Sequence, residues 1–149
     1  MCSYCGCESI EVIGRFMAEH VEIINASGIL RRACERRDDD AVVAAADALA
    51  RLLDPHTGAE EVGLFAVLAE DEEFTEHVHR LCAEHIALDT ALATIRAGDH
   101  GSYPAFDLAL RHHIDREENG LFPAAAIAFA GMEWERVHAL TPGASAATP

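Results

Sequence analysis

Apolar residues recur at spacings of three and four along four long stretches of the chain, which is the period of an amphipathic helix. No stretch alternates with the two-residue period of a strand. The apolar stripes are Ile10, Ile13, Met17 and Ile24 in the first stretch, Ala45, Leu49, Leu52, Leu64 and Val67 in the second, Phe74, Val78, Leu81, Leu88, Leu92 and Ile95 in the third, and Phe106, Leu110, Leu121 and Ala124 in the fourth. The pattern predicts four helices, over about residues 8–37, 40–68, 70–96 and 104–131.

Turn-forming residues separate the four predicted helices. The run RDDD at 37–40 supplies a turn and a helix N-cap, and AGDHGSYP at 97–104 is a loop whose proline suits a first helical turn. Pro55 falls inside the second stretch and predicts a kink or short break, with Asp54 able to cap the restart. Four helices with short connections predict an all-α fold, an antiparallel up-down-up-down four-helix bundle.

The 149 residues are enough for one domain and divide into three parts. Residues 1–7 form a cysteine-rich segment, residues 8–140 the helix bundle, and residues 141–149 a tail that we expect to be disordered. Gly131 is expected to end the fourth helix, and the short stretch MEWERVHAL at 132–140 can pack back against the bundle.

The charge of the chain restricts its partners. The formal net charge is −15, which argues against nucleic acid or an anionic membrane as a partner, because both require a basic face. An acidic protein attracts cations instead. The apolar runs are short and interrupted by charges, and no basic segment followed by an apolar stretch opens the chain. We therefore expect no membrane span, no secretion signal and a cytoplasmic location.

Three of the five cysteines, Cys2, Cys5 and Cys7, crowd into the opening run MCSYCGC. An odd number of cysteines without a secretion signal indicates reduced thiols rather than a disulfide framework. The three thiols could hold a second metal, relay electrons, or form a flexible reduced terminus. A four-thiolate zinc site would also need Cys34 or Cys82 to lie nearby.

The predicted helix stripes pass through polar residues where Leu or Ile would be expected. These residues are His20, His56, Glu60, His85, His113 and Glu117. Two carboxylates about 4 Å apart repel by roughly 4 kcal/mol at an effective dielectric constant near 20, and each loses hydration on burial. The stripes contain no Lys or Arg that would compensate this charge. A bound cation would compensate it.

The polar residues belong to an internal repeat. HTGAEEVGLF at 56–65 is echoed by HIDREENGLF at 113–122, and AEHVEI at 18–23 is echoed by AEHIAL at 83–88. Each half of the chain therefore supplies one histidine from its first helix, and one histidine and one glutamate from its second. Two such halves can face each other across a pseudo-twofold axis, which predicts a site for two metal ions. Leu64, Phe65, Leu121 and Phe122 should be core residues beside it.

Together these motifs resemble the hemerythrin-like family, the HHE cation-binding domains, over roughly residues 8–130. The resemblance implies a four-helix bundle with two non-haem iron ions bridged by two carboxylates and by an oxo or hydroxo group. It implies that the four histidines at 20, 56, 85 and 113 are terminal ligands. Glu60 and Glu117 would be the bridging carboxylates.

The sequence departs from the oxygen-carrying members of that family at two places. Those members have a further histidine one turn before the position of His85, where this chain has Leu81, and they place the last carboxylate five residues after a histidine. Here His113 precedes Glu117 by four residues; His112 would restore a spacing of five but lies about 100° around the helix. A seventh ligand could come from Glu61, Glu84, Glu118, His112 or water.

One ligand fewer leaves more coordination positions open, which favours chemistry on O2, peroxide or nitric oxide over reversible O2 carriage. The function expected first is therefore a di-iron protein that binds or consumes one of these molecules, with an external electron donor. A non-catalytic iron or oxygen sensor, an O2-binding protein and a zinc-stabilised structural bundle are the alternatives. The sequence does not assign an enzymatic activity. The histidines outside the stripes, His77, His79, His100 and His138, are expected at the surface or in supporting roles.

Overall fold

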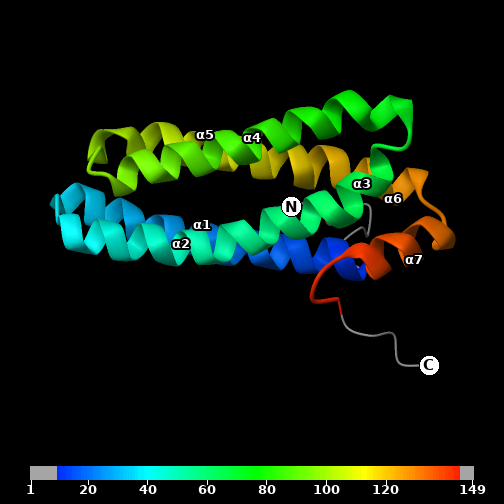
Figure 1. Cartoon of the computed structure of the whole chain (residues 1–149), viewed down its shortest axis with the longest axis horizontal. Helices are drawn as coiled ribbons and strands as arrows, with labels where there is room; N and C mark the ends of the chain where they lie inside the picture. The colour runs from blue at the N-terminus through cyan, green and yellow to red at the C-terminus, as the bar shows by residue number, and fades with distance from the viewer. Residues whose placement is uncertain (1–9, 145–149) are drawn as a thin grey trace.

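The computed structural model describes residues 10–144, which are helical over most of their length and contain no strand (Figure 1). In chain order the elements are α1 (Glu11–Arg36), α2 (Asp39–Glu60), the π-helical turn η2 (Glu61–Phe65), α3 (Ala66–Leu68), α4 (Glu72–Arg96), the 3-10 turn η3 (His100–Ser102), α5 (Tyr103–Arg116), the π-helical turn η4 (Glu117–Leu121), α6 (Phe122–Ala128) and α7 (Gly131–Leu140). The all-helical prediction is confirmed.

Four long helical segments lie side by side (Figure 1). The first is α1, the second joins α2, η2 and α3, the third is α4, and the fourth joins α5, η4 and α6. Helix α1 packs against α2 and α5, and α4 also packs against both. The stretch expected to pack back forms a fifth helical segment, α7, which contacts η2 and α3. The described chain thus has five helical segments rather than four.

Local sequence accounts for the ends of the long helices. Helix α1 ends at Arg36, and the next residue, Arg37, has a left-handed φ of 53°. The side chain of Asp38 then caps α2 by accepting the N–H of Ala41 at 3.1 Å. The Asp71 carboxylate caps α4 by accepting the N–H of Glu73 at 2.9 Å. Pro104 lies in the first turn of α5, where its missing N–H costs nothing.

Of the kink or short break predicted at Pro55, the break is wrong, because α2 continues through the proline to Glu60. A proline inside a helix loses one backbone hydrogen bond. The buried side chains of Leu53 and His56 hold the helix against its neighbours on either side of the proline. The hydroxyl of Thr57 also donates to the backbone oxygen of Asp54 at 3.3 Å. Packing therefore maintains the helical path.

Two clusters of buried apolar side chains fill the interior. One gathers around Phe16, Phe65 and Phe122 and includes Val137 of α7; the other gathers around Leu49 and Phe106. Several residues of the predicted stripes are only partly buried, namely Ile10, Ile24, Leu52, Phe74 and Ala124. Ala125 is fully buried in the fourth segment instead of Ala124.

No helix among residues 10–144 is long and apolar enough to cross a membrane. Residues 1–9 and 145–149, which include the cysteine-rich segment and most of the predicted tail, lie outside the described range. The predicted tail starts at Thr141, and this residue is buried rather than exposed.

Thr141 is buried because α7 packs closely against η2. Its hydroxyl donates to the backbone oxygen of Val137 at 2.6 Å and sits directly over Gly63. A Cβ atom at residue 63 would lie 2.3 Å from Oγ1 of Thr141. The glycine of the first repeat is therefore required by the close approach of α7.

We predict that Gly63→Ala lowers the free energy of unfolding by about 1–3 kcal/mol, because the new methyl group overlaps Thr141. Urea unfolding followed by circular dichroism measures the change at fixed metal content. Gly120→Ala is the matched control, since Gly120 has the same place in the second repeat and its Cβ would lie 3.8 Å from His77 Cε1. Equal destabilisation by both variants would contradict the steric explanation.

Candidate metal centre

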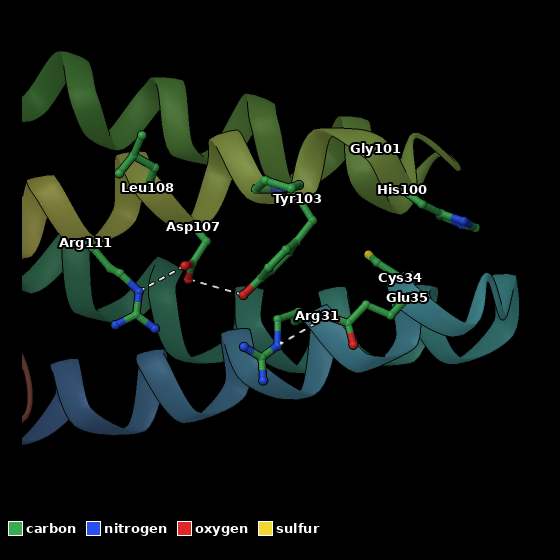
Figure 2. A pocket seen from close by; sticks show the side chains of 10 residues that line it. Arg31, Cys34, Glu35, His100, Gly101, Tyr103, Asp107, Leu108 and Arg111 are labelled. Carbon is green, nitrogen blue, oxygen red and sulfur yellow. Dashed lines mark hydrogen bonds and ion pairs between the residues drawn. The ribbon is translucent and has the colours of Figure 1, made fainter.

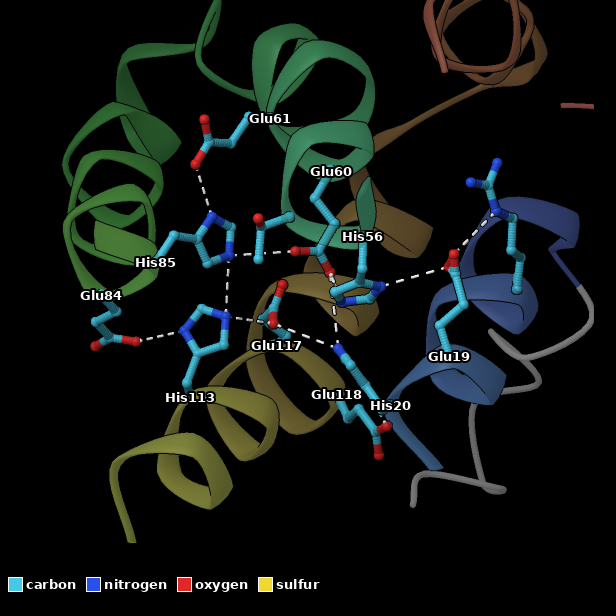
Figure 3. Close-up of polar contacts among 12 residues, drawn as sticks. Glu19, His20, His56, Glu60, Glu61, Glu84, His85, His113, Glu117 and Glu118 are labelled. Carbon is cyan, nitrogen blue, oxygen red and sulfur yellow. Dashed lines mark hydrogen bonds and ion pairs between the residues drawn. The ribbon is translucent and has the colours of Figure 1, made fainter. Parts of the chain in front are cut away.

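Six polar side chains meet in the middle of the four long helical segments (Figure 3). Helices α1, α2, α4 and α5 each contribute one histidine, α2 also contributes Glu60, and η4 contributes Glu117. The four histidines are 3% exposed and the two glutamates 0%. The set is His20, His56, Glu60, His85, His113 and Glu117, the residues singled out in the sequence.

The six residues divide into two overlapping groups of four. In each group, one donor atom from every residue lies within 4.8 Å of the others; the groups are His20, His56, Glu60 and Glu117, and Glu60, His85, His113 and Glu117. Both glutamates belong to both groups. Each group therefore offers two imidazoles and two carboxylates to one ion.

The distances place each carboxylate between the two histidine pairs. Oε1 of Glu60 lies 3.1 Å from Nε2 of His56, while its Oε2 lies 3.2 Å from Nε2 of His85. Oε1 of Glu117 lies 2.7 Å from Nε2 of His113 and 3.6 Å from Nε2 of His20. Nε2 of every histidine thus points to the centre, and both carboxylates can reach either pair.

Most of the central oxygen and nitrogen atoms lack hydrogen bonds to one another, and they are atoms of the kind that bind metal ions. Both oxygens of Glu60 and both oxygens of Glu117 are buried without a hydrogen bond, as are Nε2 of His20 and of His56. No arginine among residues 10–144 forms an ion pair with either glutamate, and the chain contains no lysine. Buried carboxylates without such partners are costly, and bound cations would remove that cost.

The structure also separates the two adjacent histidines of α5. His113 is buried in the centre, whereas His112, about 100° around the helix, is exposed. Of the other histidines, His79 is exposed, and Nε2 of His100 lies 3.0 Å from the exposed Asp39. None of them, and neither Cys34 nor Cys82, belongs to a group of metal-binding geometry within the described residues. Cys2, Cys5 and Cys7 lie outside those residues.

Comparison with known proteins agrees with this geometry. The family model described as Hemerythrin HHE cation binding domain matches residues 11–125, which contain all six central residues. The chain belongs to the hemerythrin HHE cation-binding domain family. Neither the curated proteins nor the solved structures compared with it gave a match.

A second layer of carboxylates surrounds the centre of this HHE domain. Each central histidine holds a glutamate with its outer nitrogen, Nδ1 (Figure 3). The pairs are His20 with Glu118 at 2.9 Å, His56 with Glu19 at 3.4 Å, His85 with Glu61 at 2.7 Å and His113 with Glu84 at 2.7 Å. A carboxylate that accepts the Nδ1 proton leaves Nε2 free to bind a metal and fixes the orientation of the ring.

Every outer contact joins two different helical segments, and the contacts follow the internal repeat. Glu19 and Glu84 both precede a central histidine in the motif AEH, and each holds a histidine on the next helical segment. Glu61 and Glu118 are the second residues of the two Glu-Glu pairs. Three of these glutamates were candidates for a seventh metal ligand, but they lie on the outer nitrogens. The role of Glu19 was missed, although the repeated AEH motif carried the signal.

The π-helical turns begin at the two Glu-Glu pairs. Glu60 is the last residue of α2 and Glu61 the first of η2, while Glu117 opens η4. In each pair the first side chain points into the centre and the second reaches a histidine on a neighbouring helix. A π-helical turn is wider than an α-helical one and is frequent at functional sites.

Aromatic rings close the centre on the side of the Gly-Leu-Phe motifs. Phe122 stacks on the ring of His20 with centroids 6.0 Å apart, and Phe65 stacks on His85 at 5.6 Å. Leu64 and Leu121 beside them are completely buried. The prediction that these four residues are core residues is confirmed, and they separate the centre from bulk water.

The carboxylates stabilise the protonated, positively charged form of the central histidines. Burial by itself lowers the pKa of His20, but attraction to Glu117, Glu118 and Glu60 outweighs burial and raises the pKa to about 11. Burial is likewise outweighed at His56, where Glu60 and Glu19 raise the pKa to about 9. In the opposite sense, the surrounding histidines overcome burial and hold the pKa of Glu60 well below its usual range. Protons and metal ions therefore compete for the same nitrogens.

We predict that chelator-stripped protein loses stability as the pH rises from about 6.5 towards 11. A raised folded-state pKa contributes stability that is complete below the unfolded value of 6.5 and disappears as each histidine loses its proton, near pH 9 for His56 and near 11 for His20. Urea unfolding at pH 6.5 and 9.5 measures the loss. Metal-loaded protein should lose less, because a metal binds the neutral imidazole. An equal loss of stability in the metal-free and metal-loaded protein would contradict competition between protons and metal ions for the histidines.

We predict that Glu118→Ala weakens metal binding by about 10- to 100-fold, because the ring of His20 is no longer oriented by its outer carboxylate. Competition with a chromogenic chelator measures the affinity. Glu118→Gln retains an acceptor and should recover most of the loss. Glu76→Ala, which removes an exposed glutamate of α4, is the control and should leave the affinity unchanged. A similar loss of affinity in the control would show that the change in overall charge, and not the orientation of His20, weakens metal binding.

Proposed function

We propose that this HHE domain is an up-down-up-down four-helix bundle that holds two non-haem iron ions and binds or reacts with O2, peroxide or nitric oxide. The observation that carries the proposal is the position of Glu60 and Glu117. Each carboxylate stands between two pairs of imidazoles, buried and without a hydrogen bond. Two carboxylates shared by two ligand groups are what a carboxylate-bridged pair of ions requires.

The ligand set supports iron. His20 and His56 would hold one ion and His85 and His113 the other, with Glu60 and Glu117 shared between the two ions. Each ion would then take four ligands from the protein. Imidazole and carboxylate suit non-haem iron, which commonly takes six ligands. Because Glu19, Glu61, Glu84 and Glu118 are engaged with the outer histidine nitrogens, about two positions per ion would remain for water or a small molecule.

Iron bound in this site would supply the redox chemistry, and the chain would supply the surroundings that direct it. The outer carboxylates orient the imidazoles and hold the Nδ1 protons. Phe65 and Phe122 keep bulk water from the histidine rings. The hydrogen bond between His113 and Glu84 continues to Arg116, whose Nη2 lies 2.8 Å from Glu84. Glu84 is 22% exposed, so this chain of contacts links a central ligand to solvent.

The external electron donor and the roles of Cys2, Cys5 and Cys7 stay predictions. If the three thiols relay electrons, replacing all of them by serine should slow re-reduction of the iron and leave its absorption spectrum intact. If they are only a reduced terminus, neither quantity should change.

The central experiment is anaerobic reconstitution with ferrous iron, followed by exposure to air, peroxide or nitric oxide. We expect about two irons per chain and a near-ultraviolet absorption band that responds to oxidant. Consumption of peroxide or nitric oxide with turnover would indicate an enzyme, whereas reversible binding without turnover would indicate carriage or sensing. One metal or none, or colourless protein that holds zinc, would overturn the di-iron proposal.

We predict that His56→Ala and Glu117→Ala each lose at least one of the two irons, because each removes a central ligand. Metal analysis after gel filtration measures the loss. His112→Ala is the matched control, since His112 neighbours a central histidine but is exposed. Retention of both irons in the first two variants would refute the ligand assignment, even if the protein remains coloured.

A further inference from the structure

A second site candidate lies away from the metal centre, between α1, η3 and α5 (Figure 2). It is a hollow of about 550 Å3, within the size range of small-molecule sites. Cys34, Tyr103, Pro104 and Leu108 provide apolar wall, and Arg31 and Arg111 stand at its edge. Leu108 is a large apolar side chain that is 56% exposed.

The residues that line the hollow differ between the two halves of the chain, whereas the residues of the metal centre are the same in both halves. In the register that aligns His20 with His85 and His56 with His113, Arg31 corresponds to Arg96 and Arg111 to Asp54. The counterpart hollow, between α2 and α4, is about 280 Å3 and contains both of these residues. It also contains Asp47 and Asp89, so three carboxylates face one arginine there. The larger hollow has two arginines against two carboxylates, Glu35 and Asp107.

A buried hydrogen-bond network fixes one wall of the larger hollow. The Tyr103 hydroxyl lies 2.9 Å from Oγ of Ser27 and donates to Asp107 at 3.2 Å. Ser27 is 0% and Tyr103 6% exposed. The repeat has Leu92 in place of this serine and Ala46 in place of this tyrosine. The network therefore belongs to the larger hollow alone and orients the tyrosine ring along it.

The network also leaves the arginines with spare donors. Asp107 accepts from Ser27 and Tyr103 and from Nε of Arg111 at 3.0 Å, so its charge is well satisfied. The terminal N–H groups of Arg111 have no partner among the described residues. Among the described residues, the ion pair of Arg31 is with Glu35, at 3.8 Å through Nε and with both side chains exposed. Two guanidinium groups with free N–H groups at one hollow match the planar shape of a carboxylate.

We propose that the hollow binds a small organic carboxylate with an apolar body. The carboxylate pairs with Arg31 and Arg111, and the apolar body lies along Tyr103, Cys34 and Leu108. The hollow has as many carboxylates as arginines, so the unpaired N–H groups of the two arginines, rather than net charge, select a carboxylate. The size and the apolar wall select a body larger than acetate. The site does not depend on the identity of the metal.

Isothermal titration calorimetry of the iron-loaded full chain with octanoate tests the proposal. Octanamide and octylamine have the same apolar body without the negative charge. We expect octanoate to bind one site per chain, at least tenfold more tightly than either analogue. The double variant Arg31→Gln and Arg111→Gln should weaken octanoate binding by tenfold or more, since charge-assisted hydrogen bonds are lost. The iron spectrum of that variant should be unchanged, which separates this test from the test of the metal centre.

Arg96→Gln is the matched control, because it removes the corresponding arginine from the smaller hollow. It should leave octanoate binding within twofold of the unchanged protein. Leu108→Asp provides a second test without touching an arginine, and it should weaken octanoate binding by introducing a carboxylate at the exposed wall. Octanamide binding as tightly as octanoate, an equal effect of Arg96→Gln, or no heat of binding at millimolar octanoate would overturn the proposal.

Discussion

The structure depends on one electrostatic constraint, the burial of two carboxylates among four imidazoles with no arginine or lysine in contact. Such a centre is stable only if positive charge enters it, as protons on the histidines or as metal ions. The histidine pKa values, raised to about 11 at His20 and about 9 at His56, show how strongly the carboxylates demand that charge. Family membership and the geometry agree that metal cations meet this demand.

The two halves of the chain surround the buried carboxylates with the same set of side chains. Each half of the chain repeats two histidines, a central glutamate, two outer glutamates and a stacking phenylalanine, so the two groups of candidate ligands have equivalent surroundings. The outer carboxylates cross from one helical segment to another, and every central ring is therefore fixed by two segments. Apolar clusters on both sides of the centre exclude water and strengthen these interactions in a low dielectric.

The two halves have the same residues at the metal centre and different residues elsewhere. Gly63 differs from its counterpart Gly120 because a Cβ atom at residue 63 would overlap Thr141, whereas one at residue 120 would make an ordinary contact with His77. Likewise, Ser27 and Tyr103 replace the apolar Leu92 and Ala46 and open a hollow with spare arginine donors. The halves are thus equivalent at the metal centre and differ at the contact with α7 and at the larger hollow.

The sequence by itself determined the helices and the six central residues, because helical periodicity is local and any polar residue on an apolar stripe can be read from spacing. The tertiary structure alone decided that Pro55 causes no break, that α7 covers Gly63, and that Glu19 holds His56. Those features depend on the rotation and axial shift of one helix against another, which spacing within a helix does not contain. The same reason explains why three outer carboxylates, Glu61, Glu84 and Glu118, were recognisable in the sequence as candidate ligands but not as supports of the histidines.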